Sequence, residues 1–113
     1  MSKAGKKHHD LLDETIHQRT RLAIMASLSA VDSLEFNDLK EQLGLTDGNL
    51  STHLSALERA GYVTCDKTFV GKKPRTTVAQ TPAGRTAMER YINLLQGIIS
   101  QAEPSSRKQK SDK

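Results

Sequence analysis

The chain has 113 residues and a mass of 12.5 kDa, which suits one domain with one modest core. Hydrophobic residues make up 35% of the sequence, and no apolar run is long enough to cross a bilayer, so we expect no membrane partner. A single cysteine, Cys65, excludes an internal disulfide, and the basic start lacks the apolar stretch of a secretory signal. Both features indicate the cytoplasm, and the net charge of +4 permits an anionic partner.

The first part of the chain predicts a basic arm followed by a helix. Residues 1–9 have no apolar periodicity, whereas apolar residues recur at helical spacing from Asp10 to about Ser29. A very short strand is expected over residues 34–36, and Asn37 is a suitable cap for the helix that follows. We expect the folded domain to span residues 10–101 and a loose basic tail to span residues 102–113.

Residues 39–61, LKEQLGLTDGNLSTHLSALERAG, predict two helices joined by a tight turn. The first helix stops at Gly44, the residue type most common just past a helix end, and Gly61 ends the second helix in the same way. Thr46 caps the second helix. Leu50, Leu54 and Leu57 form its buried stripe, because their spacings of four and three place them on one face.

The rest of the second helix is polar and suits contact with DNA. Small hydrogen-bonding side chains can approach base edges and phosphates closely, although a merely solvated helix face is the alternative. The candidate DNA-reading residues are Thr46, Asp47, Gly48, Asn49, Ser51, Thr52, His53 and Ser55.

Residues 62–80 predict a basic β-hairpin. YVTCDKTFV is rich in β-formers, with Val63, Cys65 and Phe69 on one alternating face, GKKPR forms the turn, and TTVAQ is the return strand. Cations cluster around this hairpin, which favours phosphate contact with a steep salt dependence over a merely solubilising loop. They are Lys67, Lys72, Lys73 and Arg75.

Thr81-Pro82 starts a last helix that runs to about Gln101, because threonine caps helices and proline suits the first helical position. Apolar residues fill two neighbouring stripes of this helix. One broad face on the chain's own core is the alternative, but we favour a dimer interface shared with the first helix. The expected interface residues are Leu11, Leu12, Ile16, Met88, Tyr91, Ile92, Leu95, Ile98 and Ile99.

The predicted fold is therefore mostly α (α+β), a winged helix-turn-helix with a two-stranded wing and a long C-terminal dimerisation helix. LTDGNLSTHLSALERAGYV followed by FVGKKPRTTVAQTPAGR resembles the small winged-helix transcription regulators of prokaryotes, of the MarR and ArsR groups, over about residues 21–91. The resemblance is strongest to a single-domain subgroup. It implies a homodimer whose third helix enters the major groove and whose wing lies on the flanking backbone or in the minor groove.

The resemblance also assigns particular residues. Arg75 matches the arginine near the wing tip that often contacts DNA in such regulators. Asp47 departs from the pattern, because its negative charge at the DNA-facing helix end stabilises the helix dipole but repels phosphate. Asp47 could instead accept a hydrogen bond from the amino group of a cytosine.

We expect a sequence-specific, double-stranded DNA-binding transcriptional regulator rather than an enzyme, because no nucleophile–base pair, phosphate loop or carboxylate pair is present. No metal or cofactor is expected, because His8, His9, His17 and His53 lack ligand spacing. Two alternatives remain open. One is a winged-helix protein-interaction module in a larger assembly, and the other is a regulator gated by a small-molecule effector that the sequence does not identify.

Overall fold

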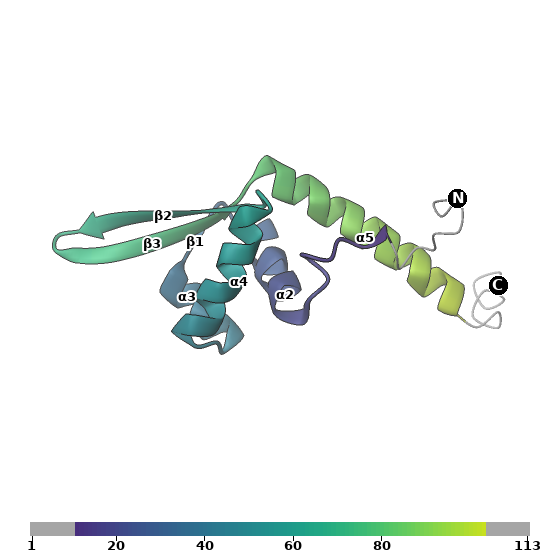
Figure 1. Ribbon diagram of the computed structural model, residues 1–113, viewed down its shortest axis with the longest axis horizontal. Coiled ribbons are helices and arrows are strands. Elements are labelled where there is room, and N and C mark those ends of the chain that lie inside the picture. Colours follow the sequence, from purple (N-terminus) through teal and green to yellow (C-terminus); the bar gives the residue numbers. More distant parts are fainter. Residues whose placement is uncertain (1–10, 104–113) are drawn as a thin grey trace, which may run out of the picture.

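The structure is a computed structural model that describes residues 11–103 (Figure 1). The basic arm expected over residues 1–9 and nearly all of the expected tail lie outside this range. The order of elements confirms the mostly α winged helix-turn-helix. The elements are α2 (Arg19–Ser29), β1 (Leu34–Glu35), α3 (Phe36–Leu43), α4 (Asp47–Arg59), β2 (Val63–Val70), β3 (Lys73–Gln80) and α5 (Pro82–Ala102).

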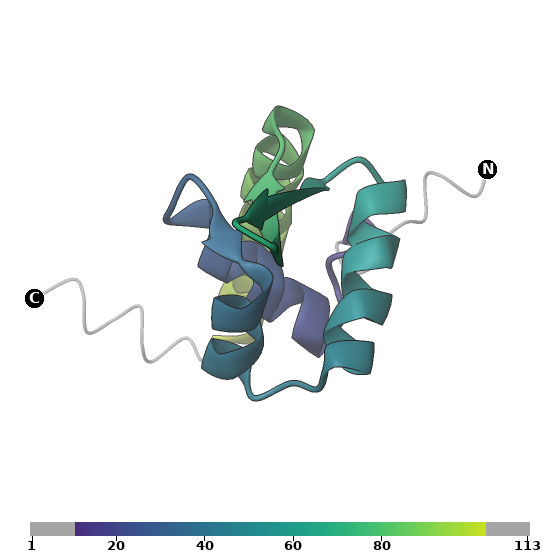
Figure 2. The ribbon, with the colours of Figure 1, turned by 90° about the vertical axis from the view of Figure 1, so that its left-hand side faces the viewer.

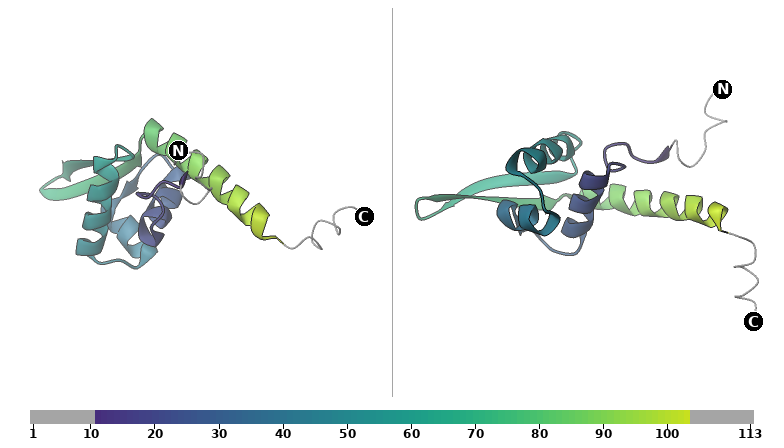
Figure 3. Two further views of the ribbon diagram at one scale, coloured as in Figure 1. Left: turned by 45° about the vertical axis from the view of Figure 1, so that its right-hand side comes forward. Right: turned by 90° about the horizontal axis from the view of Figure 1, so that it is seen from below.

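Two long arms extend from a helical body in opposite directions. The body contains α2, α3, α4 and the start of α5, and the hairpin of β2 and β3, the wing, projects from one side (Figure 1). Figure 2 looks along the wing, with α3 and α4 on either side of it. The view from below in Figure 3 shows the far half of α5 pointing away from the wing. Much of both arms therefore lies beyond the body.

The wing is rooted in a three-stranded antiparallel sheet of order β1-β3-β2. β1 pairs with β3 through Leu34 opposite Val78, so a third strand supports the root of the expected two-stranded wing. β2 and β3 pair from Val63 opposite Gln80 out to Val70 opposite Lys73. Both ends of the hairpin therefore meet the body at one place.

The turn of the wing is shorter than the five residues expected. Lys73, Pro74 and Arg75 belong to β3, which leaves Gly71 and Lys72 as a two-residue loop. Gly71 has φ +66°, as the first position of a type II′ turn requires. Pro74 is accommodated because hydrogen-bonded and non-hydrogen-bonded pairs alternate, so its missing N–H faces away from β2, where β1 does not reach.

Residues 12–18, directly before α2, are not helical, which corrects the continuous helix expected from Asp10. The Asp13 carboxylate accepts hydrogen bonds from the backbone N–H groups of Thr15 and Ile16, at 2.8 and 3.3 Å. Gln18 then caps α2 by accepting from the backbone N–H of Arg21 at 2.8 Å. These side-chain bonds compete with helical ones, so the helix begins only at residue 19.

The other helix ends agree more closely with expectation. Gly44 and Gly61 adopt φ +65° and +82°, and each ends its helix as predicted. Thr46 caps α4 by accepting from the N–H of Asn49 at 3.1 Å. Asn37 is not a cap, because α3 already begins at the preceding residue.

One apolar core joins the helices and the sheet. The core contains the predicted leucine stripe of α4, the inward-facing residues of β2 and β3 at the wing root, and residues from the first half of α5. The buried residues are Leu12, Ile16, Ile24, Met25, Leu28, Leu39, Leu50, Leu54, Leu57, Val63, Val78, Ala87, Met88 and Tyr91. No helix within residues 11–103 is long and apolar enough to span a membrane.

Candidate nucleic-acid interface

The outer face of α4 is polar and exposed. With the leucine stripe buried, helical spacing turns Gly48, Thr52 and Ser55 away from the core, and all three are exposed. Ser51 and Asn49 flank this face and are exposed as well. These side chains form a continuous surface that a groove of DNA can approach.

Arg59 completes this outer face, although the sequence reasoning missed it. It is exposed in the last turn of α4, four residues after Ser55. The spacing of Gly48, Thr52, Ser55 and Arg59 is four, three and four, so the helical periodicity could have found it. The face therefore carries one cation at its C-terminal end.

Asp47 at the N-terminus of α4 is neutralised by a neighbour. Lys40 Nζ, from the last turn of α3, lies 2.7 Å from Asp47 Oδ1. The two residues are seven positions apart in the sequence, and the turn between α3 and α4 brings their side chains together. The sequence indicated an acid at this place that repels phosphate, and the structure adds an ion pair that the sequence did not reveal.

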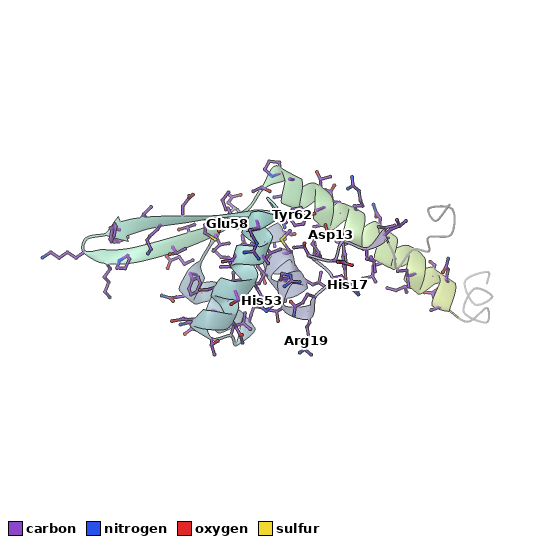
Figure 4. All side chains as sticks on the ribbon, viewed as in Figure 1. Asp13, His17, Arg19, His53, Glu58 and Tyr62 are labelled. Carbon is purple, nitrogen blue, oxygen red and sulfur yellow. The ribbon has the colours of Figure 1, made fainter. Side chains whose placement is uncertain are left out.

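His53 is half-buried at the edge of α4 that faces α2, rather than on the outer face, and its assignment as a DNA-reading residue stays a prediction. Its Nδ1 lies 3.2 Å from Nη1 of Arg21, whose Nε donates to the carbonyl of Thr15 at 2.5 Å. Figure 4 shows His53 on the side of α4 that faces α2. A guanidinium only donates, so Nδ1 is the acceptor of a neutral imidazole. Burial, with a smaller contribution from Arg21, lowers the pKa of His53 below 6.5.

The wing cations divide into two kinds. Lys67, Lys72 and Lys73 are exposed along and around the tip. Arg75 lies further back, opposite Thr68, and its Nε is 3.3 Å from Oε2 of Glu35 in β1. Arg75 belongs to β3, two residues after Lys73, and its ion pair with Glu35 links it to the body; the DNA contact implied by the resemblance stays a prediction.

Two hollows run between the wing and the helices. The larger, of about 400 Å³, lies between the wing and the start of α3. The smaller, of about 210 Å³, joins α4 to the wing through Ser51, Ser55, Cys65 and Thr76. The outer flank of α4 and the inner face of the wing thus form one concave surface.

Cys65 lies on this inner face, as expected, and is half-buried. Burial, together with the carboxylates of Glu58 and Asp66, raises the pKa of its thiol to about 11. The thiol therefore stays protonated at neutral pH, which disfavours redox chemistry.

The histidines are also dispersed. His17 Nδ1 lies 2.8 Å from the hydroxyl of Tyr91, with ring centroids 5.8 Å apart, and His8 and His9 lie outside the described residues. Within residues 11–103, no three His, Cys, Asp or Glu side chains gather as metal ligands would.

The expected dimer interface separates into buried and exposed halves. Leu12, Ile16, Met88 and Tyr91 are less than 9% exposed within the single chain, so they serve its own core and are unavailable to a partner. The remaining residues of the set stay exposed or half-buried: Leu11, Ile92, Leu95, Ile98 and Ile99.

A family model described as a winged helix DNA-binding domain matches residues 20–99. The chain belongs to this family. This winged-helix protein is 43% identical over 72 residues to an uncharacterised protein of Methanocaldococcus jannaschii, a match that covers 64% of this chain and 78% of the relative.

Two solved structures share the fold of this winged-helix protein. A transcriptional regulator homologue from Pyrococcus horikoshii OT3 superposes with a TM-score of 0.76 at 30% identity, over 81% of this chain and 91% of that one. A MarR-family regulator from Enterococcus faecalis V583 superposes with a TM-score of 0.69 at 24% identity, over 82% and 84%. The expected winged-helix regulator family is confirmed, and the likeness to the MarR-family regulator shows a shared fold.

Proposed function

We propose that this winged-helix protein is a homodimeric transcriptional regulator that binds a specific double-stranded DNA sequence through α4 and the wing. The observation that carries the proposal is the concave surface between α4 and a basic wing. Residues 67–76 hold four cations and no acid, so their charge of +4 equals the net charge of the whole chain. A polyanion is therefore attracted to this arm more strongly than to the balanced remainder.

Within this proposal, α4 selects the sequence and the wing supplies electrostatic affinity. Gly48, Asn49, Ser51, Thr52 and Ser55 meet base edges and phosphates in the major groove, and Thr46 stays at the helix end as its cap. Lys67, Lys72 and Lys73 meet the flanking duplex. Arg75 joins them only after it leaves Glu35.

The far half of α5 supports the homodimer. Ile92 and Ile99, seven residues apart on one edge of the helix, are 42% and 49% exposed, and Leu11 is 50% exposed. Leu95 and Ile98 are half-buried and pack against the edge of the core, so they continue this apolar face. A second copy packed on this face buries the apolar side chains and presents two α4 helices to a near-palindromic site.

Fluorescence anisotropy with duplex DNA at several salt concentrations tests the proposal. Lys72→Ala/Lys73→Ala is expected to weaken binding to all sequences and to reduce the slope of log affinity against log salt. Arg85→Ala/Arg90→Ala removes the same charge from exposed positions of α5 and is the control, with a smaller loss. If the two variants have equal affinities and equal salt slopes, the wing is not part of the DNA interface.

Selection of bound duplexes from a random pool tests specificity and symmetry together. An inverted repeat among the selected sequences is the expected result, and Asn49→Ala is expected to alter the preferred bases without changing the salt slope. Selected sequences without two-fold symmetry would contradict the dimer on DNA.

The second candidate function is a protein-interaction module, which uses the same fold without reading DNA. Absence of binding to random duplex DNA at low salt would favour it. A small-molecule effector also stays a prediction: NadR, whose structure in complex with 4-hydroxyphenylacetate superposes with a TM-score of 0.63 at 20% identity, shares the fold alone. A cytoplasmic place at the nucleoid follows from the proposed function.

A further inference from the structure

The tip of the wing is apolar as well as basic. Phe69 is 66% exposed and Val70 is 52% exposed, more than any other large hydrophobic side chain within residues 11–103. Both lie next to the two-residue turn, at the end of an arm that projects away from the body (Figure 1). Large apolar side chains at such a place suggest a surface that meets a partner.

The pairing register places these side chains on both faces of the hairpin. Phe69 lies opposite Pro74, on the face that carries Cys65 at the wing root, and Val70 lies opposite Lys73 on the other face. Both side chains stay more than half exposed, although Val70 also lines the larger hollow beside the start of α3. The tip is thus a narrow ribbon with apolar side chains on both sides.

Cations surround this apolar tip. Lys67 shares the face of Phe69, Lys72 is in the turn, and Lys73 lies opposite Val70. No acidic residue lies between Lys67 and Thr76. A surface that is apolar at its centre and positive around it suits a duplex groove, where bases lie between two rows of phosphates, better than a neutral lipid or a protein core.

The face of Phe69 also continues the concave surface at α4. Cys65 and Thr76, on the same face nearer the body, line a hollow together with Ser51 and Ser55 of α4. A duplex seated against α4 therefore extends along this face towards Phe69. The minor groove is about 6 Å wide, so it admits a single aromatic side chain from the tip rather than a helix.

We propose that Phe69 acts as an apolar wedge, which enters the minor groove beside the α4 site, partly unstacks one base step and bends the duplex. This inference rests on the proposed function. Bending brings more of the flanking backbone against the wing lysines, which offsets the cost of unstacking. Pyrimidine–purine steps deform most easily, so Phe69 gives a preference for such steps at flanking positions that α4 does not touch.

Ring closure of a short DNA fragment by ligase tests the wedge. A mixed-sequence fragment of about 120 base pairs is shorter than the persistence length of roughly 150 base pairs, so it closes slowly unless a bound protein bends it. We expect the wild-type protein to increase ring closure on the order of tenfold. Phe69→Ser is expected to lose most of this increase, and Phe69→Leu to keep part of it.

Anisotropy on the same fragment separates bending from binding. Phe69→Ser keeps every wing cation, so its salt slope is expected to equal that of the wild type, with affinity lower by less than about tenfold. Val31→Ser, which changes an exposed apolar residue elsewhere, is the control and is expected to bend DNA normally.

Two outcomes would overturn the wedge. Wild-type protein that binds DNA without promoting ring closure, or Phe69→Ser protein that promotes it fully, contradicts the wedge while leaving the proposed function intact. If Phe69→Ser changes the sedimentation of the protein but not its bending of DNA, the tip contacts another protein molecule instead. A wild-type protein that does not bind duplex DNA would contradict both the wedge and the proposed function.

Discussion

Lys40 and Asp47 face each other across the turn between α3 and α4, with Nζ 2.7 Å from Oδ1. The Asp47 side chain is 74% exposed, so the pair contributes less than about 1 kcal/mol to folding stability. Its position at the N-terminus of the proposed reading helix gives the pair more weight in DNA binding than in folding.

Asp47→Asn is expected to tighten DNA binding several-fold at low salt and to steepen the salt slope by about one unit, because it removes a negative charge and frees Lys40 for phosphate. Anisotropy at several salt concentrations measures both quantities. Weaker binding with an altered base preference would instead mean that Asp47 accepts a hydrogen bond from a base.

Gly84→Ala is expected to destabilise the fold by about 2–3 kcal/mol or more. A Cβ at Gly84 would lie 2.2 Å from the backbone oxygen of Tyr62, so α5 would have to move away from the body. Gly48→Ala in α4 is the matched control. No atom lies within 4 Å of its added Cβ, so a gain of about 0.5–1 kcal/mol is expected.

Urea unfolding measures the stability of both glycine variants. Gly48→Ala also gives a test on DNA, because a methyl group on the outer face of α4 hinders close approach. Unchanged DNA affinity in this more stable protein would show that Gly48 does not touch the duplex. Equal stability of the two variants would contradict the close packing at Gly84.

The stability of the protein is expected to fall as the pH rises from 10 to 12. Tyr62 donates a hydrogen bond to Asp13 Oδ2, and this bond, with burial, raises the pKa of Tyr62 to about 12. The stabilisation is complete below pH 10, the pKa of the unfolded chain, and is lost as the pH passes through the folded value.

Urea unfolding across this alkaline range, in the wild type and in Tyr62→Phe, measures the loss. The variant is expected to show a shallower decline, with Tyr91→Phe as a control for the other tyrosine, whose pKa is raised by burial. Identical pH profiles for wild type and Tyr62→Phe would contradict the bond to Asp13.

His53 is expected to titrate below pH 6.5 in the folded protein, since burial and then Arg21 lower its pKa. The neutral imidazole contributes stability that is present above pH 6.5 and lost as the pH falls through the folded pKa. Nuclear magnetic resonance of the imidazole protons follows this directly. Arg21→Gln should raise the midpoint towards 6.5, and an unmoved midpoint would leave burial as the whole cause.

Ile92→Glu/Ile99→Glu is expected to produce a monomer, because charges on the exposed edge of α5 cannot be buried against a second copy. Sedimentation measures the change, and Val31→Glu serves as a control on an apolar residue far along the chain from α5. A wild-type protein that sediments as a monomer at all concentrations would contradict the proposed dimer before any variant is made.

Helix ends and the core stripe could be predicted from the sequence because they depend on neighbouring residues. Gly44, Thr46 and Gly61 each act on a backbone within four residues, and the Leu50, Leu54 and Leu57 stripe follows from one helix alone. The same local reasoning found Thr81 as the cap of α5, where it accepts from the N–H of Gly84 at 2.9 Å.

The sequence did not reveal contacts that depend on a residue distant along the chain. His53 turns away from the outer face because Arg21, 32 residues earlier, lies beside it. Arg75 is held by Glu35 of β1, a strand of two residues whose pairing partner no local pattern reveals. Helical spacing before residue 19 was real but was outweighed by the side-chain bonds of Asp13 and Gln18.

The root of the wing has a consequence for how such proteins diversify. Val63 and Gln80 pair where the hairpin leaves the body, and Thr81 fastens that point by donating from its hydroxyl to the carbonyl of Gly61 at 2.6 Å. Two residues can be added to, or removed from, each strand beyond this point. Because side chains alternate between the two faces of a strand, such a change keeps every other side chain on its present face and leaves the core unchanged. Wing length can therefore change in steps, and with it the distance along DNA that one copy reaches, at little cost to folding.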